Sequence, residues 1–236
     1  MRLVRNSNPQ YRWGSGWGLS KRLERETSIL GTRVWHHFVV DILNRILPWD
    51  GWGGRIMATV MATGNADMEN AAVDLVNPGP DANVLMIGCG PGVGVVAAAR
   101  RTSNGMVIGC DPSAVMVERT RARCRRARVD HTTRVERAAA ELLPLPDQSQ
   151  DAVVSVNNIQ LWSDRAAGLD ECVRVLVPRG VLVVLLHTWA MSDAMTSEEW
   201  IAELCTDLST RGVVAESTQI KRFRSGPAMV LVGRVA

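Results

Sequence analysis

The sequence lacks the marks of a membrane or secreted protein. The longest uninterrupted apolar run in its C-terminal half is the six residues Val181–Leu186, whereas a helix needs roughly 20 apolar residues to cross a bilayer. The basic N-terminus has no apolar stretch followed by a small-residue cleavage site, as a signal peptide would have. We therefore expect a soluble, cytoplasmic protein with no membrane partner.

Cysteine and lysine are both scarce. The five cysteines are odd in number and form no Cys-x-x-Cys pair, which argues against a disulfide framework or a zinc site. No bound metal is expected. Lys21 and Lys221 are the only lysines, and the formal net charge is +3. A charge of this size does not call for a nucleic-acid partner.

Arginines are concentrated between residues 119 and 137, which raises the alternative of RNA binding. Met116, Thr120, Cys124 and Ala127 share one helical face in this region, so the run reads as an amphipathic surface helix. Stacking of nucleic-acid bases would require aromatic residues among the arginines, and this run has none. We expect no nucleic acid to bind here.

From residue 82 onward, short β-rich runs alternate with helical stretches. Continuous apolar strands separated by helices indicate a parallel sheet covered on both faces. Near the C-terminus, a helix over about 196–212 has a capping signature at its start and Gly212 at its end. The two runs that follow are joined by "RSGP" and are predicted to pair antiparallel at the sheet edge.

The N-terminal third has a different character. Two helices are expected, around 27–46 and 53–76, and five of the eight tryptophans lie in this third (Trp13, Trp17, Trp35, Trp49 and Trp52). We expect residues 1–75 to form a helical lid or substrate segment and residues 76–236 to form the α/β core. Simple packing of these tryptophans on the sheet is the alternative to a lid.

The stretch "VLMIGCGPGVG" at 84–94 places glycines at 88, 90, 92 and 94 after an apolar run. It does not fit the dinucleotide spacing G-x-G-x-x-G, because Val93 stands where that pattern needs glycine. It also lacks the Lys-Ser or Lys-Thr of a phosphate-binding P-loop. The spacing that fits is G-x-G-x-G, over Gly88, Gly90 and Gly92.

Asp111 closes the next apolar run, 21 residues after Gly90. In a nucleotide-binding α/β sheet, a carboxylate at the tip of the second strand can accept both ribose hydroxyls. The alternative is that Asp111 caps a helix that opens at Pro112. The spacing favours the ribose role.

Taken together, residues 80–190 resemble a class I S-adenosylmethionine-dependent methyltransferase, in particular the ubiquinone/menaquinone-biosynthesis type. The motifs that carry the resemblance are the glycine stretch, "VIGCDPS", "AAAELLPLPDQSQDAVVSVNNIQLWSD" and "VRVLVPRGVLVVLLHT". The resemblance implies a Rossmann-like, mostly parallel sheet with an antiparallel C-terminal edge strand, helices on both faces and S-adenosylmethionine as cofactor.

The resemblance also implies where the cofactor lies. The glycine loop would line its methionine and ribose portions, Asp111 would bind the ribose, and Asn157 would meet the methionine portion. Residues of the loop, the second strand's end and the segment "AAAELLP" complete the implied cofactor site: Gly88, Cys89, Gly90, Gly92, Pro112, Ala140 and Glu141.

Two positions depart from the family's pattern. Met86 stands two residues before the first glycine, where members usually carry an Asp or Glu that supports the glycine loop and the cofactor's ammonium end. Ala139 stands where an Asp commonly faces the adenine amino group. Each change removes hydrogen bonds that are worth about 0.5–3 kcal/mol.

The acceptor is expected beyond the carboxyl ends of the strands, where ligands of open α/β sheets bind. His187 follows the most apolar strand and is the candidate general base, with a strand-end structural role as the alternative. Gln160, Trp162 and Trp189 flank the same edge and are candidate substrate contacts, although tryptophan is equally a packing residue.

We therefore expect metal-independent methyl transfer to oxygen, nitrogen or carbon of a small molecule, such as a specialised metabolite. A homodimer is compatible with this expectation. The alternative is a methyltransferase-fold protein without methyl transfer, which binds a metabolite, supports a partner or steers a cyclisation. A nicotinamide oxidoreductase is disfavoured because the dinucleotide spacing is missing.

Overall fold

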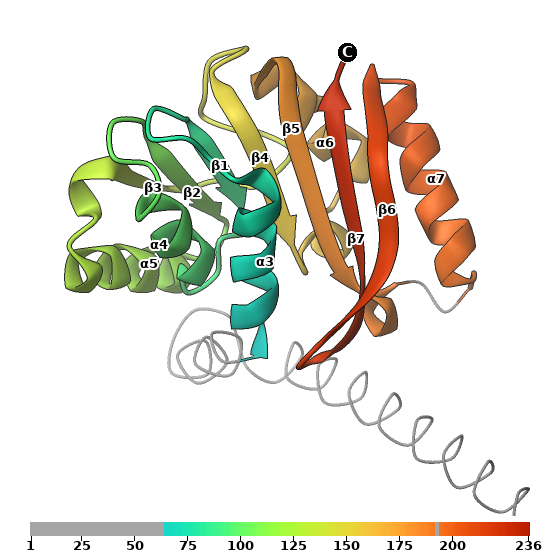
Figure 1. The fold of residues 1–236 in the computed structure, drawn as a ribbon, viewed down its shortest axis with the longest axis horizontal. Coiled ribbons are helices and arrows are strands. Elements are labelled where there is room, and N and C mark those ends of the chain that lie inside the picture. Colours follow the sequence, from blue (N-terminus) through green and yellow to red (C-terminus); the bar gives the residue numbers. More distant parts are fainter. Residues whose placement is uncertain (1–63, 192–193) are drawn as a thin grey trace, which may run out of the picture. The chain divides into compact units, whose positions relative to one another are not determined.

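The structure is a computed structural model that describes residues 64–191 and 194–236 (Figure 1). Its described part contains one seven-stranded sheet of order β3-β2-β1-β4-β5-β7-β6. The strands are β1 (Val84–Ile87), β2 (Val107–Asp111), β3 (Thr133–Arg137), β4 (Gln150–Val156), β5 (Leu176–His187), β6 (Val213–Phe223) and β7 (Gly226–Val235). The helices are α3 (Ala66–Val76), α4 (Val93–Ala99), α5 (Ala114–Ala127), α6 (Arg165–Val175) and α7 (Ser197–Ser209).

Strand direction follows the expected pattern. β1 to β5 run parallel to one another, and β7 pairs antiparallel with both β5 and β6. The mostly parallel α/β sheet predicted from the sequence is confirmed, as is the antiparallel pairing of the two C-terminal strands. β6 forms the edge, and β7 lies between it and β5.

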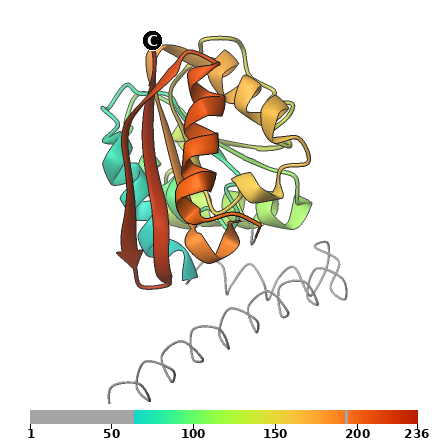
Figure 2. The ribbon, with the colours of Figure 1, turned by 90° about the vertical axis from the view of Figure 1, so that its right-hand side faces the viewer.

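Helices cover both faces of the sheet (Figures 1 and 2). Alternate residues of each central strand enter opposite core layers, as the pleat of a strand requires. Val84 and Met86 pack in the layer of α3, α4 and α5, whereas Leu85 and Ile87 pack in the layer of α6 and α7. Both sides of β1 are buried, which explains its uninterrupted apolar sequence.

Side-chain caps begin α5 and α7. The Ser113 hydroxyl accepts the backbone N–H of Met116 and begins α5, so Ser113 and not Asp111 is the cap of this helix. Thr196 and Glu199 form a reciprocal capping box at α7, which confirms the capping signature in the sequence. The buried face of α5 carries Met116, Thr120 and Cys124, as its amphipathic pattern predicts.

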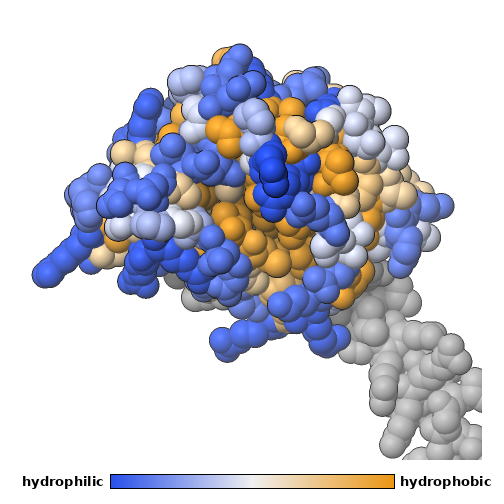
Figure 3. Space-filling view, turned by 45° about the horizontal axis from the view of Figure 1, so that its top comes forward, coloured by the Kyte–Doolittle hydropathy of each residue, from blue (hydrophilic) through white to orange (hydrophobic). Residues whose placement is uncertain are grey.

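The carboxyl ends of the parallel strands meet at one edge of the sheet, the lower edge in Figure 1. Figure 3 tilts the opposite, upper edge toward the viewer and shows hydrophobic surface among hydrophilic residues on this side. No described helix combines the length and the apolar character that a bilayer span requires.

Most of the expected N-terminal segment lies outside the described residues. This applies to the predicted helix at 27–46, the start of the helix at 53–76, and the five tryptophans named above. The part of the second helix that the structure describes is α3, which packs beside α4 and against β4 and β5. The lid and its boundary at 75–76 stay predictions.

Candidate functional site

The glycine loop between β1 and α4 depends on its glycines. Gly88, Gly90 and Gly92 have φ angles of +57°, +50° and +80°, a left-handed region that other residues adopt at a cost. A Cβ on Gly88 would also lie 2.6 Å from Cγ of Asn158. The loop therefore exposes backbone where a side chain would otherwise block the approach of a ligand.

Asp111 supports this loop from the end of β2. Its Oδ2 accepts the Gly90 N–H at 2.9 Å, and its Oδ1 accepts the Ser113 N–H at 2.9 Å. The residue is 7% exposed, and burial raises the pKa of its carboxyl while these two backbone hydrogen bonds lower it. Each carboxylate oxygen can accept a further hydrogen bond. Pro112, beside it, is exposed.

Helix α5 holds the loop from the other side, a contribution that sequence reasoning missed. The Thr120 hydroxyl donates to the Gly90 carbonyl at 2.7 Å, and Nε of Arg123 donates to the Pro91 carbonyl at 2.7 Å. Cys89 is buried behind the loop, and burial together with the Asp111 carboxylate raises the pKa of its thiol. Cys89 thus supports the loop from behind, and its backbone N–H bonds the Cys110 carbonyl.

Asn157 and Asn158 join the end of β4 to its two neighbouring strands. The side chain of Asn157 accepts the His187 N–H at 3.0 Å and donates to Oδ1 of Asn65 at 3.1 Å. Asn158, which sequence reasoning also missed, donates to the Ile87 carbonyl at 2.8 Å. The two side chains thereby fix the ends of β1, β4 and β5 relative to one another.

Gln160 and Trp162 follow directly. Nε1 of Trp162 donates to Oδ1 of Asn158 at 3.0 Å, and its ring packs on Gly168, where a Cβ would approach to 2.4 Å. Nε2 of Gln160 donates to the Asn157 carbonyl, whereas its Oε1 is buried and has no hydrogen-bond partner among the residues that the structure describes. A buried acceptor without a partner costs free energy and is available to a ligand's donor.

His187 ends β5 at the same edge. It is 1% exposed, its ring stacks on Trp189 with centroids 5.2 Å apart, and its Nδ1 lies 3.3 Å from the Pro227 carbonyl. A base must reach the proton it removes. His187 and Trp189 lie side by side, and the structure brings both to the strand end that carries Asn157.

Ala140 and Glu141 lie in the loop between β3 and β4. Ala140 is buried. The carboxylate of Glu141 accepts the backbone N–H groups of Ser163 and Asp164 and the Ser163 hydroxyl. Burial opposes these hydrogen bonds, but together they lower the pKa of Glu141. Glu141 thus anchors the turn after Trp162.

A second carboxylate stands beside the glycine loop, and sequence reasoning missed it. Glu69 of α3 is 8% exposed, and burial raises the pKa of its carboxyl to about 8. An ideal Cβ on Gly94 would lie 2.2 Å from Oε2 of Glu69 and 2.5 Å from Cε of Met86. The sequence signal for this contact was Gly94, a glycine inside helix α4 whose missing side chain leaves room for the Glu69 carboxylate.

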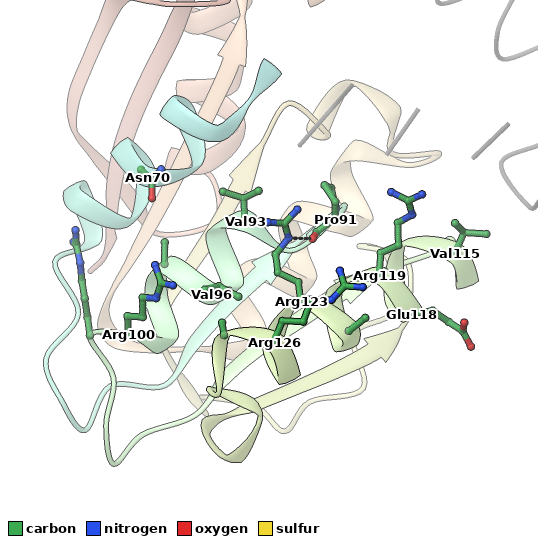
Figure 4. Close-up of a pocket in the computed structure, with 14 residues that line it drawn as sticks. Asn70, Pro91, Val93, Val96, Arg100, Val115, Glu118, Arg119, Arg123 and Arg126 are labelled. Carbon is green, nitrogen blue, oxygen red and sulfur yellow. Dashed lines mark hydrogen bonds between the residues drawn. The ribbon is translucent and has the colours of Figure 1, made fainter. Parts of the chain in front are cut away.

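A hollow of about 1010 Å³ lies away from the strand ends, on the outer side of α4 and α5 (Figure 4). Five arginines line it: Arg100, Arg101, Arg119, Arg123 and Arg126. Most of its lining is the surface of α4 and α5, and Pro91 of the glycine loop lies at its border, but none of the implied cofactor residues lines it. Its size therefore does not mark the reaction site.

The residues at the carboxyl edge fit S-adenosylmethionine. The loop offers backbone without side chains, Asp111 offers acceptors for ribose hydroxyls, and Gln160 offers an unpartnered acceptor. Within residues 64–191 and 194–236, no group of three or more His, Cys, Asp or Glu side chains could hold a metal ion.

Comparison with known proteins agrees with this fit. Residues 84–180 match the model of a methyltransferase domain. This part of the chain is therefore similar to a methyltransferase domain. The match covers the glycine loop, Asp111 and both asparagines at the end of β4.

Three curated proteins are similar to part of this chain. A probable S-adenosylmethionine-dependent methyltransferase of Mycolicibacterium smegmatis is 40% identical over 148 residues, 58% of this chain and 53% of that protein. The ubiquinone/menaquinone biosynthesis C-methyltransferase UbiE of Geotalea daltonii is 31% identical over 48% of this chain and 49% of that protein. The 27-O-demethylrifamycin SV methyltransferase of Amycolatopsis mediterranei is 37% identical over 43% of this chain and 37% of that protein. The chain thus spans about half, or less, of these three relatives.

Solved structures share the fold at low sequence identity. A Haloferax volcanii methyltransferase, in complex with a methyltransferase activator, superposes with a TM-score of 0.68 at 18% identity, over 79% of this chain and 97% of that one. The 4+2 cyclase SpnF superposes with a TM-score of 0.62 at 17% identity, over 72% of this chain and 80% of that one. These likenesses concern the fold alone.

Proposed function

We propose that this protein transfers the methyl group of S-adenosylmethionine to oxygen, nitrogen or carbon of a small molecule, a specialised metabolite among the candidates. The observation that carries the proposal is the hydrogen bond between Asp111 and Gly90, which places a carboxylate and side-chain-free backbone at one strand edge. Relatives named for small molecules, UbiE and the rifamycin methyltransferase, support the substrate class.

In this proposal the chain's residues bind the cofactor and orient the acceptor. Gly88, Gly90 and Gly92 lie along the methionine and ribose portions, Asp111 accepts from the ribose, and Asn157 meets the methionine portion. The walls of the cofactor site are completed by Cys89, Pro112, Ala140 and Glu141. The bound cofactor supplies an activated methyl group, so alignment of the acceptor provides much of the rate.

The acceptor would lie between Gln160, Trp162 and Trp189, with His187 as the base where the acceptor carries a proton. His187 is 1% exposed and stacked on Trp189, and its Nδ1 lies 3.3 Å from the Pro227 carbonyl. A soluble, cytoplasmic location and a homodimer belong to the same proposal.

The second candidate is a protein of this family that steers a reaction without methyl transfer. The observation in its favour is the likeness to SpnF, a cyclase with this fold. It too would bind the cofactor, so binding does not separate the two candidates, whereas turnover does.

The deciding experiment is calorimetric titration with S-adenosylhomocysteine, after removal of any cofactor that copurifies. Micromolar binding by wild type, lost in Asp111→Ala, supports the cofactor site. Formation of S-adenosylhomocysteine from S-adenosylmethionine with a panel of small acceptors then supports methyl transfer. No binding by folded wild-type protein would end the proposal.

A further inference from the structure

The carboxylate of Glu69 is buried next to the glycine loop, and no cationic side chain pairs with it in the described part of the chain. It is 8% exposed, and among the described residues it forms no ion pair and no side-chain hydrogen bond. A buried carboxylate is costly unless a cation or donors compensate it. This arrangement indicates that a positive group from outside the described protein completes the site.

Gly94 provides the space for this carboxylate. Unlike the three preceding glycines, Gly94 has no left-handed φ angle, so backbone conformation does not require a glycine there. A Cβ would instead meet Oε2 of Glu69 at 2.2 Å and Cδ of Glu69 at 3.3 Å. The loop and α3 are thus shaped around the carboxylate.

The position of Glu69 connects it with the cofactor edge. Asn65, one helical turn earlier and outside the start of α3, bonds Asn157 at the end of β4, while Glu69 reaches the start of α4 beside Met86. The same side of α3 therefore faces both the end of β4 and the glycine loop. Met86 itself carries no charge that could serve there.

We infer that Glu69 binds the α-ammonium group of S-adenosylmethionine, and that this chain supplies the cofactor's counter-charge from helix α3 and not from the strand before the glycine loop. The inference rests on the proposed cofactor site. S-adenosylmethionine and S-adenosylhomocysteine both carry this ammonium group, whereas 5′-methylthioadenosine shares their nucleoside and lacks the amino-acid portion.

The difference between S-adenosylhomocysteine and 5′-methylthioadenosine gives a direct test. Wild type and Glu69→Gln are titrated with S-adenosylhomocysteine and with 5′-methylthioadenosine. We expect the variant to bind S-adenosylhomocysteine about 10- to 100-fold more weakly, as expected for loss of a charged hydrogen bond, and to bind 5′-methylthioadenosine within about twofold of wild type. Retained nucleoside binding also shows that the variant is folded.

Two results would overturn the inference while leaving the proposed function intact. One is unchanged affinity of Glu69→Gln for S-adenosylhomocysteine. The other is an equal loss for both ligands, which would mean that Glu69 supports the loop and not the ammonium. Failure of wild type to bind either ligand would instead refute the proposed function.

Proton release provides a readout that does not depend on activity. Free protein holds a proton on Glu69 near neutral pH, and pairing with an ammonium requires the carboxylate. The titratable groups coupled to this site include the Cys89 thiol, itself beside Asp111. Titrations at pH 7 in buffers of different ionisation enthalpy should show release of close to one proton in wild type and little in Glu69→Gln. Equal release in both would count against the pairing.

Discussion

Oδ2 of Asp111 accepts a 2.9 Å hydrogen bond from the backbone N–H of Gly90, across 21 residues of sequence. This contact joins the end of β2 to the glycine loop. It gives Asp111 two tasks, because the same carboxylate that shapes the loop is the one available to a ribose.

The variant Asp111→Asn distinguishes the proposed role of Asp111 in ribose binding from that of Glu69 in ammonium binding. The amide nitrogen of asparagine would face either the Gly90 or the Ser113 N–H, and the charged acceptor for ribose hydroxyls is lost. We expect S-adenosylhomocysteine and 5′-methylthioadenosine to lose affinity alike, by about 10- to 100-fold. Calorimetry with both ligands checks this. A loss confined to S-adenosylhomocysteine would contradict a ribose role.

Gly94→Ala should disturb the carboxylate without touching the loop's φ angles. The added Cβ forces Glu69 or Met86 to move, so we expect roughly 5- to 50-fold weaker binding of S-adenosylhomocysteine and a loss of about 1–3 kcal/mol in unfolding free energy. Gly79→Ala is the matched control, because nothing lies within 4 Å of its Cβ position. Equal behaviour of the two variants in titration would disprove the role of Gly94.

A charge at position 86 should replace the one removed at position 69. In Glu69→Gln, the further change Met86→Glu introduces a carboxylate beside the space that Glu69 Oε2 occupies. We expect the double variant to recover at least about a tenfold gain in S-adenosylhomocysteine affinity over Glu69→Gln. The matched control is Met86→Gln in the same background, which should recover none.

Stability should depend on pH through Glu69. Burial raises the pKa of its carboxyl from 4.5 to about 8 in the folded protein, so between these values the folded protein keeps a proton that the unfolded chain releases. Its stability therefore falls as pH rises from about 5 to 8. Glu69→Gln removes this cost, and we expect it to exceed wild type by about 2–5 kcal/mol at pH 8 and to match it near pH 5.

Urea unfolding of both proteins at pH 5 and pH 8 measures this difference. Saturating S-adenosylhomocysteine should stabilise wild type more at pH 8 than Glu69→Gln, because only wild type gains a charged partner. A pH-independent gap between the two proteins would show that the carboxyl is ionised at both pH values.

Asn158 should be important for stability rather than for cofactor binding alone. Its Nδ2 donates to the Ile87 and Val156 carbonyls, and its Oδ1 accepts from Ser155 and Trp162. Asn158→Asp has the same shape but loses both donations, so we expect a loss of about 2–4 kcal/mol in unfolding free energy. Trp162→Phe, which removes one of these hydrogen bonds, should cost about 1 kcal/mol. Urea denaturation distinguishes the two.

The sequence predicted most of the fold because its apolar runs and glycines have local meanings. Buried parallel strands read as continuous apolar segments, and Gly88, Gly90 and Gly92 follow from a turn that needs left-handed backbone. Asp111 was found by its distance from the loop. The cap at Ser113 was not, because aspartate and serine are both good caps and only the hydrogen bonds decide between them.

The residues that were missed act over long distances. Glu69 lies in "ADMENAAVDLV", where a carboxylate in a helix reads as solvent-exposed until its packing against Gly94 is known. Thr120 was assigned to the buried face of its helix, but its hydrogen bond to the Gly90 carbonyl spans 30 residues. Asn158 is one of two adjacent asparagines, and no local pattern says which of them turns inward.

The hairpin of β6 and β7 also determines when the fold can be completed during synthesis. β7 is made after β6, yet it must take its place between β6 and β5. Until β7 leaves the ribosome, the edge of β5 that carries Val183, Val184 and Leu185 has no partner strand, and β6 has nothing to pair with. A nascent chain stopped before Gly226 would therefore present an open, apolar strand edge, which is a template for aggregation. Chaperone binding should persist on such a chain until the final strand is inserted.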